Sequence, residues 1–215
     1  VYPSPGALAV LLNACGRNAD AERIDELYAM ALHVLASRSN NREWRMAHWT
    51  QLEDGMLTAL SHAGLGERAN VHRQRLISAD QVPSASAYAA LIATIQERTD
   101  DAVVAEQLFS ESQRLGVRPT TYLYNTVISK LSRARKVDQA LRLFDEMRTA
   151  NLRPSSVTYG AAINACVRTG DETRATQLFA EMDAQPTFRP RVPPYNTMIP
   201  YFLHSTKHSE KALHY

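Results

Sequence analysis

A spacing of about 35 residues recurs along this chain, and it constrains the fold more than any other feature. Tyr124 is followed 35 positions later by Tyr159, and Phe144 is followed 35 positions later by Phe179. A step of 36 positions back from Tyr124 reaches Tyr88. A unit this short cannot bury a core by itself, so the repeat predicts an array of stacked units that share one continuous core.

Each unit has the pattern of two helices joined by a turn. In residues 121–155, apolar residues follow the three-and-four spacing that places a stripe on one side of a helix. The stripe of the first helix holds Tyr124, Val127, Ile128 and Leu131, and that of the second holds Val137, Ala140, Leu141, Phe144 and Met147. Pro154 ends the unit because proline cannot continue a helix. The pattern predicts an all-α fold.

We expect residues 1–215 to form a single α-solenoid domain. The predicted repeats are 5–49, 50–84, 85–120, 121–155, 156–191 and an incomplete 192–215. The first is some ten residues too long, and its excess at 37–48 is either an extended second helix or a loop. Because the chain opens on Val1 and stops within a repeat, we expect it to be a fragment of a longer chain.

Composition indicates a folded, soluble chain. Of the 215 residues, 45% are hydrophobic and 21% are charged, and no apolar run reaches the length that crosses a bilayer. We therefore expect no membrane insertion. The formal net charge of +2 is too small to indicate a nucleic-acid binder by itself. Cys15 and Cys166 lie in different repeats, and we expect each to be a small buried residue.

These motifs resemble the pentatricopeptide repeat family. The resemblance rests on Tyr-Asn-Thr at 124–126, Ala-Leu-x-Leu-Phe-x-x-Met at 140–147 and Leu-Arg-Pro at 152–154. The tetratricopeptide repeat, with 34 residues, fits less well. The resemblance implies a right-handed α-solenoid that binds single-stranded RNA in mitochondrial RNA processing, stability or translation. It also implies a non-enzymatic protein with a mitochondrial location.

In this family a base is read by the residue after the first-helix tyrosine, together with the last residue of the repeat. The resemblance assigns the pairs Asp54 with Ser84, Ala89 with Thr120, Asn125 with Ser155, and Gly160 with Arg191, while Asn196 has no partner. Asn125 carries both a donor and an acceptor, and with Ser155 it resembles a pyrimidine reader. Ala89 and Gly160 have no polar side chain, so their repeats are expected to read bases poorly.

Two further sets of residues suit an RNA strand. Tyr122 and Val157, near the starts of first helices, would stack on bases, although Tyr122 would equally pack on the next repeat. Arginines lie eight positions after the base-reading position on the same helical face, where they would meet phosphates or simply offset the helix dipole. They are Arg17, Arg133 and Arg168, with His62 and His204 at equivalent places and Glu97 interrupting the series.

Other candidate sites are weaker. Trp44 and Trp49 lie among arginines and would either stack on RNA or anchor the long first repeat. No histidine spacing suits a metal, and no glycine-rich phosphate loop is present, so we expect no catalytic residue, metal or cofactor. The alternative function is a protein-binding scaffold, such as a repeat subunit of a mitochondrial ribosome or other ribonucleoprotein assembly. The sequence does not indicate an oligomeric state.

Overall fold

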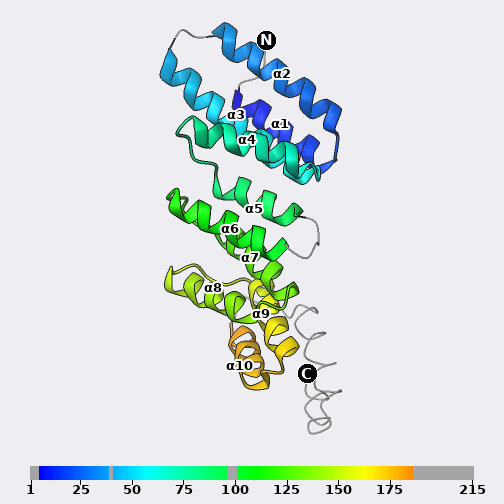
Figure 1. Ribbon diagram of the computed structural model, residues 1–215, viewed down its shortest axis with the longest axis vertical. Coiled ribbons are helices and arrows are strands. Elements are labelled where there is room, and N and C mark those ends of the chain that lie inside the picture. The colour runs from blue at the N-terminus through cyan, green and yellow to red at the C-terminus, as the bar shows by residue number, and fades with distance from the viewer. Residues whose placement is uncertain (1–4, 39–40, 96–100, 186–215) are drawn as a thin grey trace. The chain divides into compact units, whose positions relative to one another are not determined.

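The computed structural model describes residues 5–38, 41–95 and 101–185, and this part of the chain contains ten α-helices and no β-strand (Figure 1). The helices are α1 (Pro5–Arg17), α2 (Ala21–Arg38), α3 (Arg42–His62), α4 (Gly66–Ser78), α5 (Ala85–Thr94), α6 (Asp101–Arg114), α7 (Thr121–Arg133), α8 (Val137–Thr149), α9 (Ser156–Thr169) and α10 (Glu172–Asp183). The predicted all-α class is confirmed. None of these helices is both long enough and apolar enough to cross a membrane.

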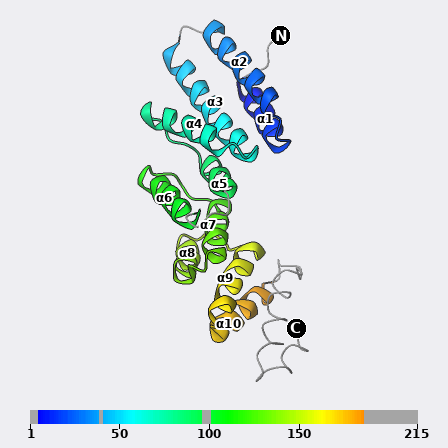
Figure 2. The same cartoon turned by 45° about the vertical axis from the view of Figure 1, so that its right-hand side comes forward.

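The helices belong to two compact units, which we describe separately. The first unit contains α1 to α5 and α6 from Val103 onward, and the second contains α7 to α10. In the first unit α3 packs against α1, α2, α4 and α5, so it is the central helix (Figure 2). In the second unit α7 packs against α8 and α9, and α9 also packs against α10. The single uninterrupted domain over residues 1–215 stays a prediction.

The predicted stripes form the cores of the helical pairs. In α7 the buried apolar residues include Tyr124, Val127 and Ile128, and in α8 all five predicted residues are buried. Phe144 is fully buried, and its ring meets the ring of Tyr159 edge to face with centroids 5.3 Å apart. The aromatic residues that recur at the 35-residue period thus join one helical pair to the next within the second unit.

The turns between helices share one hydrogen-bonding pattern. After α7, for example, Arg135 adopts a positive φ of 60° and the Lys136 amide donates to the Leu131 carbonyl at 2.9 Å. This bond closes a Schellman motif, which satisfies carbonyl groups at the helix end. The same positive φ occurs at Ala19, Gly64, Asp80, Gly116, Asn151 and Gly170. A common turn geometry keeps successive pairs equivalent even where their sequences differ.

The excess residues of the first repeat lengthen two helices. The helix α2 continues to Arg38, and α3 has 21 residues where α7 has 13. The Asn41 side chain accepts a hydrogen bond from the Trp44 amide at 3.1 Å and caps α3. The sequence left an extended second helix and a loop as alternatives, and the structure instead divides the excess between α2 and α3.

The helices α1 and α3 approach closely at a glycine. A Cβ atom placed on Gly16 would lie 2.4 Å from the carbonyl oxygen of Ala59 and 2.6 Å from its Cα atom. No side chain fits at such a distance, so only glycine allows this contact. The sequence pattern gave no indication of it.

Candidate nucleic-acid interface

The second unit brings the strongest predicted base-reading pair together. The Asn125 Nδ2 group of α7 donates to the Ser155 hydroxyl at 3.0 Å, and Asn125 Oδ1 accepts a hydrogen bond from the Thr158 hydroxyl. Ser155 is also the N-cap of α9 and accepts from the Thr158 amide at 3.3 Å. These bonds hold the Asn125 amide in one orientation. An amide has two N–H donors and an oxygen that accepts twice, so one donor and one acceptor site remain for a ligand.

The first unit contains a second pair at the equivalent positions, with a different charge and the opposite hydrogen-bond direction. The Asp54 carboxylate of α3 accepts two hydrogen bonds from Ser84, one from the amide and one from the hydroxyl, both at 2.7 Å. Ser84 caps α5, as Ser155 caps α9. Burial raises the pKa of Asp54 above its ordinary value, and the hydrogen bonds from Ser84 oppose that shift. The pair therefore presents an acid where the second unit presents an amide.

We expect Asp54→Asn to remove a pH-dependent loss of stability. The pKa of Asp54 is raised in the folded state above the ordinary pKa of 3.8 that applies in the unfolded state. At pH values between these two pKa values, the folded protein therefore binds more protons than the unfolded protein. Stability contributed by the neutral carboxyl is thus lost over this window. Urea unfolding followed by tryptophan fluorescence between about pH 3.5 and pH 7 should show the variant gaining stability over wild type as pH rises. Asp25→Asn, at an exposed acid of α2, is the control, and a pH-independent difference would contradict the prediction.

The remaining predicted base-reading residues differ in their surroundings. Thr120 caps α7 by accepting a hydrogen bond from the Leu123 amide at 3.2 Å. Ala89 is fully buried, and Gly160 lies partly exposed on α9. Arg191 and Asn196 lie outside the described residues. Three of the residues that end a predicted repeat lie in the described part of the chain. Each is the N-cap of the helix that follows: Ser84, Thr120 and Ser155.

Among the large apolar side chains that the structure describes in the second unit, the two predicted stacking residues are the exposed ones. Tyr122 is 52% exposed near the start of α7, and Val157 is 56% exposed near the start of α9. Most apolar side chains on these helices are buried, so this exposure leaves two surfaces available to a ligand. Tyr122 is thus available to a base over about half of its surface, and the alternative in which it packs on the next repeat also stays a prediction.

The predicted phosphate residues lie at the carboxyl ends of first helices. Arg168 Nη1 donates to the backbone carbonyl of Arg133 at 3.1 Å, which joins the ends of α9 and α7. Both arginines are exposed. In the first unit Arg17 is exposed, and the pKa of His62 is lowered by burial and by the positive charge of Arg17. Within each unit the predicted positions therefore lie at the carboxyl ends of first helices, and both the phosphate contact and the alternative helix-dipole role stay predictions.

The sequence analysis missed a hydrogen bond that repeats between the two helices of a pair. The Tyr88 hydroxyl donates to Glu111 at 2.7 Å, and the Tyr124 hydroxyl donates to Glu146 at 2.8 Å. Burial and the neighbouring glutamate raise the pKa of both tyrosines. Glu111 and Glu146 are 35 positions apart, so the repeat period carried the signal. These bonds place the first helix, and hence the residue after the tyrosine, against the second.

Neither cysteine forms a disulfide. Cys166 is buried as expected, and burial raises the pKa of its thiol to about 11. Cys15 is only partly buried, which differs from the expectation. Within residues 5–38, 41–95 and 101–185, no group of three or more histidine, cysteine or acidic side chains is placed to hold a metal ion.

Family models match the second unit. The model described as the PPR repeat family matches residues 119–168, and the model described as the PPR repeat matches residues 157–185. One curated relative, the pentatricopeptide repeat-containing protein 5, mitochondrial, of Schizosaccharomyces pombe, is 44% identical over 219 residues. The match covers 100% of this chain and 17% of that protein, so the chain spans about a sixth of the relative's length.

Solved structures share the fold. The nuclear proteinaceous RNase P 2 of A. thaliana aligns with a TM-score of 0.68 at 14% identity, covering 91% of this chain and 41% of that one. The pentatricopeptide repeat protein PPR10 in complex with an 18-nt psaJ RNA element aligns with a TM-score of 0.60 at 23% identity, covering 96% of this chain and 30% of that one. At these identities the likeness confirms the predicted α-solenoid class.

Proposed function

The chain belongs to the pentatricopeptide repeat family, and on that premise we propose that it binds single-stranded RNA along its first helices and reads a base with Asn125 and Ser155. The observation that supports this most is the fixed Asn125 amide, which keeps one donor and one acceptor free of Ser155 and Thr158. Such a group can pair with the edge of a pyrimidine. The RNA complex of a structural relative agrees with this proposal.

Three further groups of residues complete the proposed interface. Tyr122 and Val157 would stack on bases, since both side chains are more than half exposed. Arg133 and Arg168 would contact phosphates, with Arg17 in the equivalent place of the first unit. Asp54 with Ser84, and Thr120 in the second unit, would serve as weaker base-reading positions; we make the same proposal for Arg191 and Asn196.

The proposed biological role is the handling of mitochondrial RNA. The name of the S. pombe relative supports a mitochondrial location. A positioned RNA strand would be shielded or presented to other factors in processing, stability or translation, without a catalytic step by these residues. The relative extends well beyond this chain, so this role concerns the repeats alone.

The base-reading part of the proposal is tested with Asn125→Ala. We expect wild-type protein to prefer a pyrimidine at one position of an oligonucleotide series, and the variant to lose about 1–3 kcal/mol of that preference. Fluorescence anisotropy with oligonucleotides that differ at a single base measures this. Thr158→Val, which removes the hydroxyl that orients the amide, should weaken the same preference. An unchanged base preference in Asn125→Ala would refute base reading by this repeat.

The phosphate part is tested with the double variant Arg133→Glu and Arg168→Glu. We expect its affinity for all single-stranded sequences to fall about tenfold or more, and the slope of log K against log salt to decrease by about 1.4, since each phosphate contact contributes about 0.7. Arg142→Glu with Arg174→Glu is the matched control, because Arg142 is exposed on the second helix α8 and Arg174, which pairs with Asp145, is partly exposed on the second helix α10. Equal affinity and equal slope in both double variants would sink the proposed column.

A further inference from the structure

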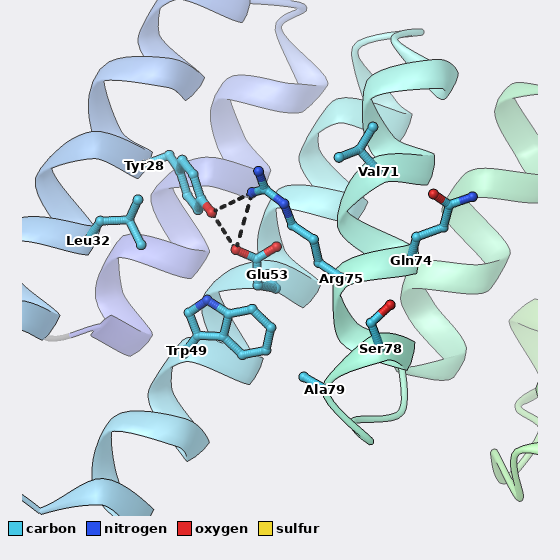
Figure 3. A pocket seen from close by; sticks show the side chains of 9 residues that line it. All are labelled: Tyr28, Leu32, Trp49, Glu53, Val71, Gln74, Arg75, Ser78 and Ala79. Carbon is cyan, nitrogen blue, oxygen red and sulfur yellow. Dashed lines mark hydrogen bonds and ion pairs between the residues drawn. The ribbon is translucent and has the colours of Figure 1, made fainter.

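The lengthened helices of the first repeat build a groove on the first unit. Two open hollows adjoin there, with volumes of about 710 and 440 Å³, and they share Leu32, Trp49 and Ala79 as lining residues. We call this surface the α2–α4 groove; it is lined by Leu32, Met46, Trp49, Val71 and Ala79, with Arg42, Arg45 and Arg75 beside them. All of these residues come from α2, α3 and α4 or from the turn after α4. Figure 3 shows the residues that line the larger hollow.

The polar groups at the floor of the groove are bonded to one another. Glu53 is fully buried, and it accepts hydrogen bonds from the Tyr28 hydroxyl and pairs with His72 Nδ1 at 2.7 Å. Arg75 reaches over from α4, with Nη1 3.3 Å from the Tyr28 hydroxyl and 4.0 Å from Glu53 (Figure 3). Tyr28 of α2 and His72 of α4 thus occupy the Glu53 carboxylate. The surface that the groove presents to a ligand is mainly apolar.

The apolar lining is unusually accessible for a folded chain. Leu32 is 38% exposed, Met46 is 37% exposed and Val71 is 48% exposed. Trp49 is partly buried, and its ring stands beside Glu53 in the wall of the groove. Exposed apolar side chains that gather around a hollow mark interaction surfaces, whereas single ones need no explanation.

The charge around the groove is positive. Arg42 and Arg45 line the smaller hollow, and neither guanidinium group makes a hydrogen bond or ion pair with the residues that the structure describes. The only acid in the lining is Glu53, which is already bonded to Tyr28 and His72. A ligand with negative charge flanking an apolar face therefore complements this surface.

The groove is separate from the proposed RNA interface. On α3, Trp49 and Asp54 are five residues apart, which places them about 140° apart around the helix axis. Trp44 stacks on His48 with ring centroids 4.1 Å apart, so one face of its indole is covered. Apart from Trp49 and Tyr28, the apolar lining is aliphatic, whereas base stacking mainly uses aromatic rings, and these observations favour a protein ligand over RNA.

We propose that the α2–α4 groove binds an acidic amphipathic helix of a partner protein. The two hollows, which share Trp49 as a lining residue, would take successive aliphatic side chains of one helical face, at positions such as i, i+3 or i+4, and i+7. Asp or Glu residues beside that face would meet Arg42 and Arg45. A strand-adding ligand does not fit, because the groove is made of helices whose backbone groups are bonded within each helix.

The test is a selection of helical peptides, displayed on phage, against the full chain. The library randomises the apolar face and the flanking positions independently. We expect enriched peptides to carry aliphatic residues at the spacing above and Asp or Glu at the flanks. Against Arg42→Glu with Arg45→Glu, we expect the enriched flanks to change to Lys or Arg. This reversal of charge preference is a result that loss of folding cannot produce.

Two double variants then locate the bound peptide. Leu32→Glu with Met46→Glu should weaken the best peptide at least about tenfold by fluorescence anisotropy. Val103→Glu with Val104→Glu on α6, at 41% and 38% exposure, is the matched control and should leave its affinity unchanged. Any of three results overturns the proposal. Either no peptide is enriched, or the peptides enriched on wild type carry neutral or basic flanks, or binding survives the Leu32 and Met46 changes. Competition by a random single-stranded RNA pool that binds wild type but not this variant would overturn it in favour of an RNA surface.

Discussion

Glu53→Ala is expected to lower the free energy of unfolding of the first unit by about 3–5 kcal/mol. The carboxylate is fully buried, and its loss leaves the Tyr28 hydroxyl and His72 Nδ1 without their partner while opening a void in α3. Urea unfolding measures the change. Trp44 and Trp49 are the only tryptophans of the chain and both lie in α3, so their fluorescence reports on this unit.

The control for this change is Glu53→Gln, which keeps the shape of the side chain and an oxygen that accepts from Tyr28. We expect it to cost clearly less than the alanine variant, since the groups around it keep partners. If both variants unfold at the wild-type urea concentration, the cluster around Glu53 does not stabilise the unit, and its packing has been misjudged.

Gly16→Ala is the second change with a large expected effect, and its direction opposes helix propensity. In an open helix position this change stabilises by roughly 1 kcal/mol. Here the new methyl group would collide with the Ala59 backbone, which cannot rotate away as a side chain can. We therefore expect a loss of about 2–3 kcal/mol as α1 and α3 are pushed apart.

Gly66→Ala provides the comparison for Gly16→Ala. Gly66 is the first residue of α4, and nothing lies within 4 Å of a Cβ atom placed there. We expect that variant to be as stable as wild type or slightly more stable, by up to about 1 kcal/mol. Thermal unfolding followed by circular dichroism compares the two. A Gly16→Ala protein that melts at or above the wild-type temperature would show that the two helices adjust without cost.

Much of the fold follows from periodicity in the sequence. The stripes in residues 121–155 predicted α7 and α8, and their predicted apolar residues are buried. This works because each pair packs mainly against its nearest neighbours, so spacing along the chain corresponds to contact in space. The central helix α3 was harder to interpret, because it is packed on several sides and has no single apolar stripe.

Other contacts that were missed join residues outside the repeat pattern. Glu53 stands where later repeats have the first-helix tyrosine, and the Tyr28 hydroxyl of α2 in the preceding pair donates to it. The orienting role of Thr158 was not predicted, because a threonine at the third position of a helix has no distinctive sequence pattern. Asn125 and Ser155, by contrast, were paired from the family pattern, and the structure places them within hydrogen-bonding distance.

Three residues cap a helix and also occupy a proposed base-reading position, and this affects how such arrays change in evolution; they are Ser84, Thr120 and Ser155. The residue that would help to choose a base also begins the next helix, and only Ser, Thr, Asp and Asn, with Gly close behind, do so well. Replacing a cap by alanine costs about 1 kcal/mol. At these three described positions, change without a cost in helix stability is therefore limited to short polar residues, a set that does not include the Arg191 of the following repeat. On the proposed function, exchanging one capping residue for another would change the target preference with little loss of helix stability.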